Sequence, residues 1–497
     1  MTASYVLALD QGTTGSTALV VDARGRIRGR AYSELTQHYP RPGWVEHDPE
    51  DIWQGSRRVM RAALRNAKVK PSQIAALGIT NQRETTLLWD RKTGLPVHRA
   101  IVWQDRRTAS LCQELKAAGH EPWVRERTGL VLDPYFSGSK LRWLFENVKG
   151  LRSRASSVLF GTVDSYLVFK LTGGKAHLTD YTNASRTLVF DIHKKRWDPD
   201  LLDLFHVPPS ILPDVVSSSG LLATTDPAVF GARVPIAGIA GDQQAALYGQ
   251  ACFEPGRGKN TYGTGCFLLV FTGTETVASS RGLITTLACA ENGAPAYAVE
   301  GSVFIAGASV QWLRDGLGFF KKSAEVEALA RSVDSTLGVV MVPAFVGLGA
   351  PYWDPDARGA LLGLTRGVTR AHVARAALES IAYQTRDVVE ATVEASGKPI
   401  TELRVDGGAA ANDFLLQFQA DVLGVPVDRP KQVETTALGA AFLAGRGVGI
   451  WTSAKDIEAL RKTDRVFTPR LSARSREALY QSWTAAVSAA RTFRTQS

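Results

Sequence analysis

Cysteine is scarce in this sequence, and the few cysteines form no recognisable pattern. Among 497 residues there are 4 cysteines, with no CxxC pair and no histidine at ligand spacing; they are Cys112, Cys252, Cys266 and Cys289. Scattered cysteines in so long a chain predict reduced thiols and argue against a disulfide-stabilised secreted domain. We therefore expect a cytoplasmic protein.

Long apolar runs are missing as well. No stretch approaches the roughly eighteen consecutive apolar residues that a membrane-spanning helix needs. The opening residues, MTASYVLALD, have no basic region and lead directly into an apolar stretch, so they do not read as a signal peptide. We expect no membrane span.

Two familiar nucleotide-binding motifs are absent. No GxxxxGK[ST] occurs, which excludes a Walker-type P-loop, and no GxGxxG follows an expected strand. The net charge is +10, but the basic residues are spread out, as in SRRVMRAALR (56–65), which is typical of a solvated helix face. Without a long basic run interleaved with aromatics, we expect no nucleic-acid partner. The positive charge favours acidic small ligands only weakly.

What is present indicates a globular protein of two large domains. Apolar residues make up 44% of the chain and charged residues 21%. A chain of 497 residues is too long to fold around a single hydrophobic core of ordinary size. The glycine-rich and charged stretch FEPGRGKN (253–260) is the expected boundary, giving domains 1–252 and 253–497.

The stretch VLALDQGTTGSTALVVDARG (6–25) predicts a hairpin with an unusual turn. Apolar runs flank a turn that is rich in glycine and hydroxyl groups and is preceded by Asp10. Gly12 and Gly15 could serve only backbone geometry. Alternatively, the turn is a phosphate cradle, in which backbone N–H groups face an anion and the aspartate faces a magnesium ion.

Later segments repeat this pattern and add helices. We expect a strand at 27–34, a helix that begins after Asp48, a strand at 74–80 followed by another in NQRETTLLWD, and strand, turn and helix at 232–251. A second Gly/Thr hairpin follows at 261–273, which suggests a duplicated fold. A long helix should run from Thr369 to Gly397, and 402–424 reads as strand, Gly-Gly turn and helix.

Nine motifs in order resemble one family. They are DQGTTGS, NQRETT, DPYFSGSKLRWL, GDQQAALYGQ, NTYGTGCF, GASVQWLRD, APYWDP, LRVDGG and TALGAAFLAG. This set is similar to the FGGY carbohydrate kinases from Tyr5 to about Trp451. The resemblance implies an α/β fold of two RNase-H-like domains, of the actin/hexokinase/Hsp70 type, with an interdomain active-site cleft.

The resemblance also implies an ATP site with Mg²⁺. Asp10 corresponds to the residue that faces the metal in this family. Nucleotide contacts are implied for Thr13, Thr14, Ser16, Thr264, Gly307, Gln311, Gly408 and Asn412. Each of these positions, taken alone, could be ordinary turn chemistry.

The branch of the family most similar to this sequence phosphorylates glycerol. That likeness implies acceptor contacts from Arg83, Glu84, Tyr135, Asp242, Gln243, Trp103 and Phe267. Polar groups would pair with the hydroxyls, while Trp103 and Phe267 would pack against the carbon chain. Taken alone, Arg83 and Glu84 could be a surface ion pair, and the two aromatic residues could be core.

Asp242 is the expected catalytic base. It follows an expected strand and opens an expected helix, where it could instead be a helix N-cap. The resemblance favours the functional role, in which the carboxylate takes the proton of a primary hydroxyl that attacks the γ-phosphoryl group of ATP. The implied products are sn-glycerol 3-phosphate and ADP, in glycerol catabolism.

One residue departs from the pattern, and other functions stay open. This branch typically reads DQGTTSSR, whereas Thr17 stands here in place of the arginine. A kinase for a pentulose or another polyol would keep the same ATP site. A non-enzymatic nucleotide switch of the actin or Hsp70 kind would need a peptide-binding or filament-forming region, which we do not find. The family likeness implies a homodimer or homotetramer.

Overall fold

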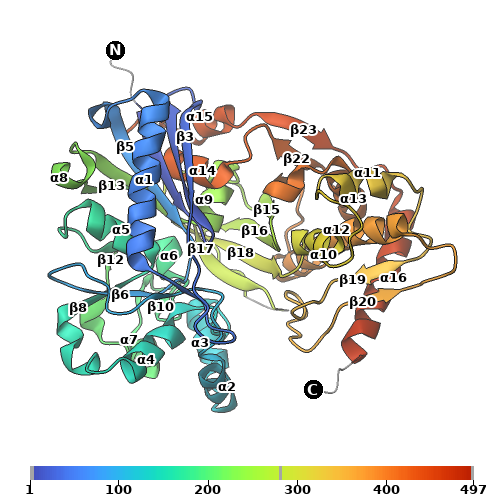
Figure 1. Ribbon diagram of the computed structural model, residues 1–497, viewed down its shortest axis with the longest axis horizontal. Coiled ribbons are helices and arrows are strands. Elements are labelled where there is room, and N and C mark those ends of the chain that lie inside the picture. Colours follow the sequence, from blue (N-terminus) through green and yellow to red (C-terminus); the bar gives the residue numbers. More distant parts are fainter. Residues whose placement is uncertain (1–4, 279–281, 494–497) are drawn as a thin grey trace.

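The computed structural model describes residues 5–278 and 282–493. In Figure 1 two α/β parts lie side by side, the blue-to-green part of the chain on the left and most of the yellow-to-red part on the right. Each contains one large mixed sheet, of six strands in the first half and seven in the second. We call these the first and second sheets.

The first sheet has the order β13-β14-β5-β1-β2-β3. The three opening strands form an antiparallel meander, while β5 and β14 run parallel to β1. The opening hairpin and the third strand are therefore confirmed. The bounds are β1 (Tyr5–Gln11), β2 (Gly15–Asp22), β3 (Ile27–Glu34), β5 (Ile74–Asn81), β13 (Ser219–Thr224) and β14 (Pro235–Gly241).

Helices cover both faces of this sheet. On one face α1 (Pro49–Ala67) begins as expected, with Asp48 accepting a hydrogen bond from the backbone N–H of Glu50 at 2.8 Å. Its apolar side packs mainly on β2 and β3, while α5 (Val163–Leu171) packs on β5 and β14. These contacts place one hydrophobic core between the helices and the sheet.

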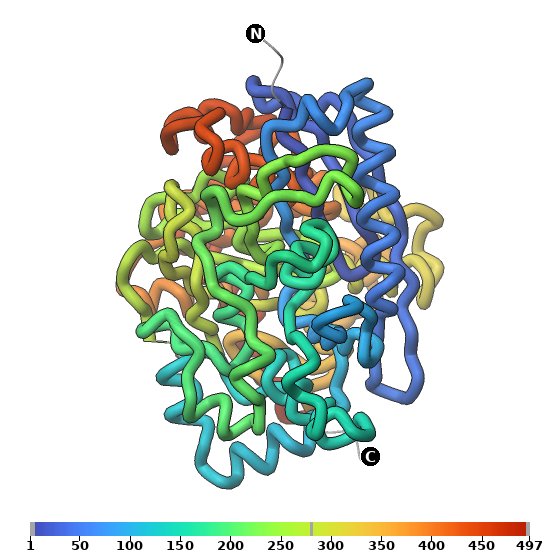
Figure 2. Tube along the Cα trace, turned by 90° about the vertical axis from the view of Figure 1, so that its left-hand side faces the viewer, coloured from blue at the N-terminus to red at the C-terminus, as the bar shows by residue number. Residues whose placement is uncertain are grey.

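The other face is covered by a helix from far along the chain. This helix is α14 (Thr435–Gly447), and Figures 1 and 2 show its red-orange segment beside the blue strands. At Gly78 a Cβ would lie 2.1 Å from the carbonyl oxygen of Ala440, so only glycine permits this approach. A helix from the C-terminal half of the sequence thus packs on the first sheet. The expected domain boundary after residue 252 therefore stays a prediction.

The second sheet repeats the first. Its order is β17-β18-β16-β15-β21-β22-β23. The five strands from β18 to β22 have the same relative directions as β3-β2-β1-β5-β14, which confirms the expected duplication. The bounds are β15 (Gly258–Tyr262), β16 (Cys266–Gly273), β17 (Ile284–Cys289), β18 (Pro295–Val303), β21 (Leu403–Asp406), β22 (Val427–Pro430) and β23 (Thr463–Phe467).

The long helix of the second half is α12 (Arg370–Ser396). It begins after Thr369 and ends before Gly397, which has a φ of 64°, so both expected ends are confirmed. Neighbouring helices are α9 (Asp242–Gly249), α10 (Gly307–Asp315), α11 (Glu325–Arg331), α13 (Asp413–Leu423) and α16 (Ala473–Thr492).

Smaller elements complete the fold. The strand expected in NQRETTLLWD is only β6 (Leu87–Asp90), and it pairs with β8 (Val158–Gly161) instead of joining the first sheet. Residues 82–85 are irregular and carry polar groups that are described below, and Thr86 forms an isolated bridge with Ile101. The remaining elements are β4 (Glu46–His47), β7 (Ala100–Ile101), β9 (Leu178–Asp180), β10 (Phe190–Asp191), β11 (Arg196–Trp197), β12 (Asp214–Val216), β19 (Val340–Val342), β20 (Ala360–Leu362), α2 (Ala109–Ala117), α3 (Glu121–Thr128), α4 (Ser137–Asn147), α6 (Tyr181–Ala184), α7 (Pro199–Leu204), α8 (Pro227–Phe230), α15 (Ala454–Leu460), η1 (Pro71–Gln73), η2 (Arg152–Ser157), η3 (Pro209–Ile211) and η4 (Gly408–Ala411).

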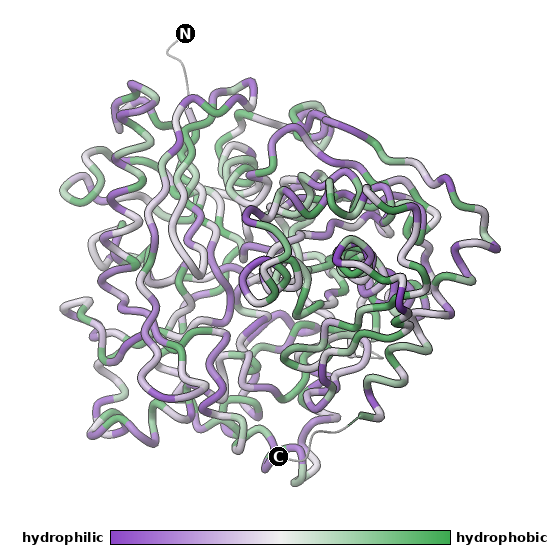
Figure 3. Tube along the Cα trace, turned by 45° about the vertical axis from the view of Figure 1, so that its right-hand side comes forward, coloured by the Kyte–Doolittle hydropathy of each residue, from purple (hydrophilic) through white to green (hydrophobic). Residues whose placement is uncertain are grey.

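All four cysteines are buried and free. Among the residues that the structure describes, no helix combines the length and apolar character needed to span a membrane. Figure 3 shows hydrophilic and hydrophobic segments alternating along the trace.

Candidate active site

The candidate site lies where three parallel strands end. In the register of the first sheet, Gln11 of β1, Asn81 of β5 and Gly241 of β14 stand side by side. Asp10 directly precedes this row, while Asp242 directly follows it. The carboxyl ends of parallel strands are where open α/β sheets bind ligands. The fold therefore brings Asp10, Arg83 and Asp242 to one edge.

Asp242 is not the N-cap of its helix. Gly241 occupies that position, and Asp242 is the first helical residue, with its Oδ1 accepting from the backbone N–H of Gln243 at 2.7 Å. The backbone N–H of Gly241 donates to Thr182 Oγ1 at 2.8 Å, which fixes the turn. The Asp242 side chain keeps 28% of its surface exposed and lies 3.3 Å from Arg83 Nε.

Arg83 and Glu84 are not a surface ion pair. Both side chains are 2% exposed, and Arg83 Nε lies 3.8 Å from Glu84 Oε1. The guanidinium also makes a bidentate contact with Glu300 of β18, at 2.6 and 3.0 Å. Burial alone would raise the pKa of Glu300, but the guanidinium groups of Arg186 and Arg83 lower it to about 2.

Arg186, which sequence reasoning missed, completes this buried charge network. Its Nε donates to Glu84 Oε1 at 2.6 Å, and its Nη2 donates to Glu300 Oε1 at 3.0 Å. The sequence around it, NASRTL, matches none of the motifs. The network contains two cations and the carboxylates of Glu84 and Glu300, with Asp242 at its open side.

The backbone at Glu84 is strained. Its φ is +61°, in the left-handed region that non-glycine residues seldom adopt. Its carbonyl oxygen accepts from Ser137 Oγ at 2.9 Å and from Thr86 Oγ1 at 3.0 Å. Strain held by surrounding hydrogen bonds is typical of functional sites, because it fixes a side chain in one direction.

Three aromatic rings from separate segments gather beside this network. The ring centroids of Trp103 and Tyr135 are 5.4 Å apart, and those of Trp103 and Phe267 are 6.5 Å apart. The indole N–H of Trp103 donates to Thr13 Oγ1 at 2.8 Å. These residues form a partly exposed apolar wall that reaches from the first domain to β16. The expected grouping of these residues is present.

Gln243 contacts a second residue that sequence reasoning missed. The ammonium group of Lys259, in β15, donates to Gln243 Oε1, to Thr261 Oγ1 at 2.8 Å and to the carbonyl oxygen of Phe267 at 3.4 Å. Burial lowers the pKa of Lys259, although nearby Asp406 and Asp242 oppose this. Lys259 thus links Gln243 of the first domain to Phe267 of the second.

The turn of the opening hairpin presents only some of its expected groups. The backbone N–H of Gly12 donates to the carbonyl oxygen of Gly15 at 2.9 Å, and Thr14 is exposed. Ser16 pairs with Gln11, on the sheet face toward α1, and is 2% exposed. Asp10 and Thr17 share the opposite face. The structure therefore does not bring the Ser16 side chain together with Asp10.

Asp10 lies in a strongly negative environment. Burial and the negative charges of Asp242 and Glu434 raise its pKa to about 8. Within residues 5–278 and 282–493, no group of three or more His, Cys, Asp or Glu side chains is placed to hold a metal unaided. A carboxylate with acidic neighbours and few protein ligands suits Mg²⁺, which keeps waters and binds substrate phosphates.

The second hairpin lies against the start of α10. The carbonyl oxygen of exposed Thr264 accepts from the backbone N–H of Ala306 at 2.8 Å. At Gly307 a Cβ would lie 2.6 Å from the carbonyl oxygen of Gly263, so the two turns touch. Gln311 is exposed, one helical turn beyond Gly307. The structure brings Thr264 and Gly307 together.

The two residues of the Gly-Gly turn, Gly407 and Gly408, differ in the space around them. Gly407 has a φ of 86°, and a Cβ there would lie 2.4 Å from the carbonyl oxygen of Tyr262. A Cβ at Gly408 would meet no atom within 4 Å, so a flat group could approach its backbone. Asn412 caps α13, its Oδ1 accepting from the backbone N–H of Leu415 at 2.9 Å. Its side chain therefore has a structural role.

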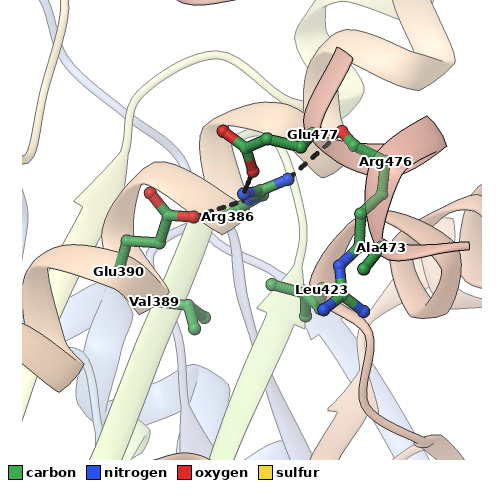
Figure 4. Close-up of a pocket in the computed structure, with 7 residues that line it drawn as sticks. All are labelled: Arg386, Val389, Glu390, Leu423, Ala473, Arg476 and Glu477. Atoms are coloured by element: carbon green, nitrogen blue, oxygen red, sulfur yellow. Dashed lines mark hydrogen bonds and ion pairs between the residues drawn. The ribbon is translucent and has the colours of Figure 1, made fainter. Parts of the chain in front are cut away.

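A separate pocket lies on the second domain, between α12, α13 and α16. Its volume is about 350 Å³. Figure 4 shows Arg386 between Glu390 and Glu477, both at 2.7 Å. The pocket contains none of the expected site residues.

Comparison with known proteins places this geometry in a family. The model for the FGGY family of carbohydrate kinases, N-terminal domain, matches residues 5–249, and that for the C-terminal domain matches residues 258–448. Glycerol kinase 2 of Thermotoga maritima is 57% identical, covering 97% of this chain and 98% of its own length. A glycerol kinase of Dechloromonas aromatica is 58% identical, covering 97% of each chain.

A solved structure extends the likeness to the fold. The crystal structure of Plasmodium falciparum glycerol kinase with ADP has a TM-score of 0.92, 35% identity and coverage of 98% of each chain. The two α/β domains with mixed sheets, and the polar residues at the carboxyl ends of β1, β5 and β14, are features of a two-domain sugar-kinase-like fold. The chain belongs to the FGGY family of carbohydrate kinases, as its ordered motifs indicate.

Proposed function

We propose that this protein transfers the γ-phosphoryl group of ATP to a terminal hydroxyl of glycerol, giving sn-glycerol 3-phosphate and ADP. The observation that carries the proposal is the convergence of Asp242 with the buried Arg83–Glu84 pair at one strand edge. Relatives named glycerol kinase, 57% and 58% identical over nearly the full length, support the choice of acceptor.

Recognition of the acceptor follows from the chemistry of the surrounding groups. Glycerol has three hydroxyls on a short carbon chain, so its site must offer several donors and acceptors beside an apolar wall. Arg83 donates, Glu84 accepts, and Tyr135 and Gln243 can do both. Trp103 and Phe267 cover the carbon chain. Because these polar groups would be left unpaired by an acceptor lacking hydroxyls, they also select against such molecules.

In the proposed chemical step Asp242 accepts one proton. Its carboxylate takes the proton of a primary hydroxyl while that oxygen forms a bond to the γ-phosphorus of ATP. The bond between the γ-phosphorus and the β,γ-bridging oxygen breaks, and ADP leaves with that electron pair. The position of Asp242 at the start of α9 supports this role, because Gly241 is the N-cap residue and the Asp242 side chain stays 28% exposed.

The nucleotide would lie between the two hairpins. Thr13 and Thr14 come from the first turn, while Thr264 and Gly307 come from the second turn and the adjoining α10. The open surface at Gly408 suits the adenine or ribose, with Gln311 and the backbone at Asn412 beside it. The similar Plasmodium glycerol kinase was crystallised with ADP, which supports a nucleotide site in this fold.

Asp10 would hold Mg²⁺ together with waters and phosphate oxygens. Its acidic surroundings fit a divalent cation, since a bound cation would offset the repulsion from Asp242 and Glu434. When bound, the ion supplies charge neutralisation at the phosphates.

An acceptor panel tests the proposal. Purified protein with Mg²⁺ and ATP is given glycerol, xylulose, gluconate or no acceptor, and ADP release is measured. We expect kcat/KM for glycerol to exceed that for each other acceptor by at least about 100-fold. A higher value for xylulose or gluconate would overturn the choice of acceptor, and equal ADP release without acceptor would overturn the kinase assignment.

A further inference from the structure

The hairpin of β17 and β18 belongs to the second sheet but is anchored on the first domain. The backbone N–H of Thr285 donates to the carbonyl oxygen of Gly129 at 3.1 Å. The hydroxyls of Ser185 and Thr286 lie 3.2 Å apart. The two strands are therefore fixed to both domains, and any side chain on them that faces the first domain has a rigid support.

Glu300 is such a side chain. It lies within β18, opposite Leu269 of β16 and Ile284 of β17, and none of its side-chain surface is exposed. Its carboxylate receives both Nη atoms of Arg83 and Nη2 of Arg186. Both of these hydrogen-bond partners are arginines that border the proposed acceptor site.

We infer that Glu300 is a positioning residue for the acceptor site, which the second domain supplies to hold Arg83 and, through Arg186, Glu84. This inference rests on the proposed function and goes beyond it, because it assigns acceptor recognition to a residue outside the expected contacts. Glu300 itself lies behind Arg83 and is not proposed to touch the acceptor.

The geometry gives the physical reason. A guanidinium has two edges that can make bidentate contacts, and Glu300 occupies the edge formed by the two Nη atoms of Arg83. Nε then remains near Asp242 and Glu84, at 3.3 and 3.8 Å. Without the Glu300 carboxylate, Arg83 would turn more of its donors toward those two carboxylates. The acceptor would then compete with an internal ion pair.

Arg186 extends the same effect to Glu84. It bridges Glu84 and Glu300 with adjacent nitrogens, at 2.6 and 3.0 Å. Loss of Glu300 would leave Arg186 with Glu84 as its remaining carboxylate partner, tightening that pair. One substitution at Glu300 would therefore displace both proposed acceptor-binding side chains, Arg83 and Glu84. The proposed nucleotide site would be unchanged.

Steady-state kinetics of Glu300→Gln and Glu300→Asp test the inference. Gln keeps the shape of the side chain but removes its charge, while Asp keeps the charge on a shorter stem. We expect the KM for glycerol to rise at least about tenfold in Glu300→Gln and less in Glu300→Asp, with the KM for ATP within about twofold. Glu275→Gln is the matched control, since its partner Lys398 lies 3.7 Å away and the glutamate is 79% exposed.

A double-mutant cycle of Glu300→Gln and Arg83→Lys distinguishes the positioning of Arg83 from a general loosening of the fold. If Glu300 acts through Arg83, the double variant should raise the KM for glycerol by much less than the product of the two single effects. A multiplicative result, an unchanged KM for glycerol in Glu300→Gln, or an equal rise in both KM values would overturn the inference.

Failure of a variant to fold and failure of the proposed function give different results. Should Glu300→Gln fail to fold, the Glu300→Asp variant and its cycle with Arg83→Lys decide by the same criteria. If the wild-type protein does not phosphorylate glycerol, the proposed function fails and this inference fails with it. If it does and the variants are unaffected, only the role of Glu300 is wrong.

Discussion

The Nε atom of Arg83 lies 3.3 Å from Oδ1 of Asp242, while both Nη atoms of the same guanidinium bind Glu300. One side chain thus connects the end of β14 in the first sheet with β18 in the second. Because the contact with Glu300 is buried and charge-assisted, it holds the guanidinium in place. The position of Asp242 therefore depends on residues from both domains.

Replacing Arg83 by lysine should weaken acceptor binding selectively. Lysine keeps the charge that Glu84 and Glu300 require but loses the planar, bidentate geometry. We expect the KM for glycerol to rise about 10- to 100-fold and the KM for ATP to change by less than about threefold. Arg142→Lys, at an exposed pair with Glu146, is the control. An effect confined to ATP would move Arg83 to the phosphate side.

Replacing Asp10 by asparagine should reduce the apparent affinity for Mg²⁺. The change removes the carboxylate charge at the end of β1 but keeps the size of the side chain. Activity titrated with Mg²⁺ at fixed ATP should require at least about tenfold more metal for half-maximal rate. Asp22→Asn, at the far end of β2, should titrate like wild type. Equal metal requirements in both variants would contradict the assignment of Asp10.

Thr17→Arg tests whether the missing arginine is a deficit. Thr17 pairs with Asp10 across the opening hairpin and shares its face, so a longer cationic side chain there could reach the phosphates. We expect the KM for ATP to fall about two- to tenfold with little change for glycerol. Thr17→Gln separates length from charge. If the arginine variant binds ATP no better, another group already supplies that charge.

Asp387 should make stability depend on pH. It is a buried residue of α12 that accepts from Tyr480 Oη at 2.5 Å and from Trp483 Nε1 at 2.9 Å, anchoring α16. Burial raises its pKa from 3.8 to about 7. The folded state thus binds a proton more tightly than the unfolded state. This contribution to stability is present below the unfolded pKa and is lost as pH rises through about 7.

The test compares wild type with Asp387→Asn between pH 5 and pH 8. Asparagine costs some stability at every pH, because it loses one acceptor, but it cannot ionise. The free energy of unfolding of wild type relative to the variant should therefore fall by on the order of 1–3 kcal/mol over this range. Chemical denaturation at each pH measures it. A constant difference would show that Asp387 does not titrate there.

Much of the architecture could be predicted from local sequence. The strand at 27–34 and both ends of α12 followed from polar caps, glycine and apolar periodicity, which act within a few residues. The two hairpins were recognisable because glycine and threonine interrupt apolar runs. Local signals did not reveal that α14 packs on the first sheet, since that contact joins residues more than 350 positions apart.

The candidate site could be inferred only in part from the sequence, for a similar reason. Glu300 stands in the apolar run of β18, and a charged residue in such a run was an available signal for a buried ion pair. Its partners Arg83 and Arg186 could not be read from the sequence, because they lie in the other domain, and neither could the contact of Lys259 with Gln243. Ser16 was grouped with the residues around Asp10, but the register of the hairpin places its side chain on the opposite face of the sheet.

Asp242→Asn tests whether Asp242 is the catalytic base. Asparagine keeps the shape of the first residue of α9 but cannot accept the proton. We predict that kcat for glycerol phosphorylation falls by about 10²- to 10⁴-fold, while ATP binding measured by calorimetry stays within about threefold of wild type. Asp200→Asn, at an exposed ion pair with Arg127, controls for the substitution itself. Turnover close to wild type in Asp242→Asn would contradict the account.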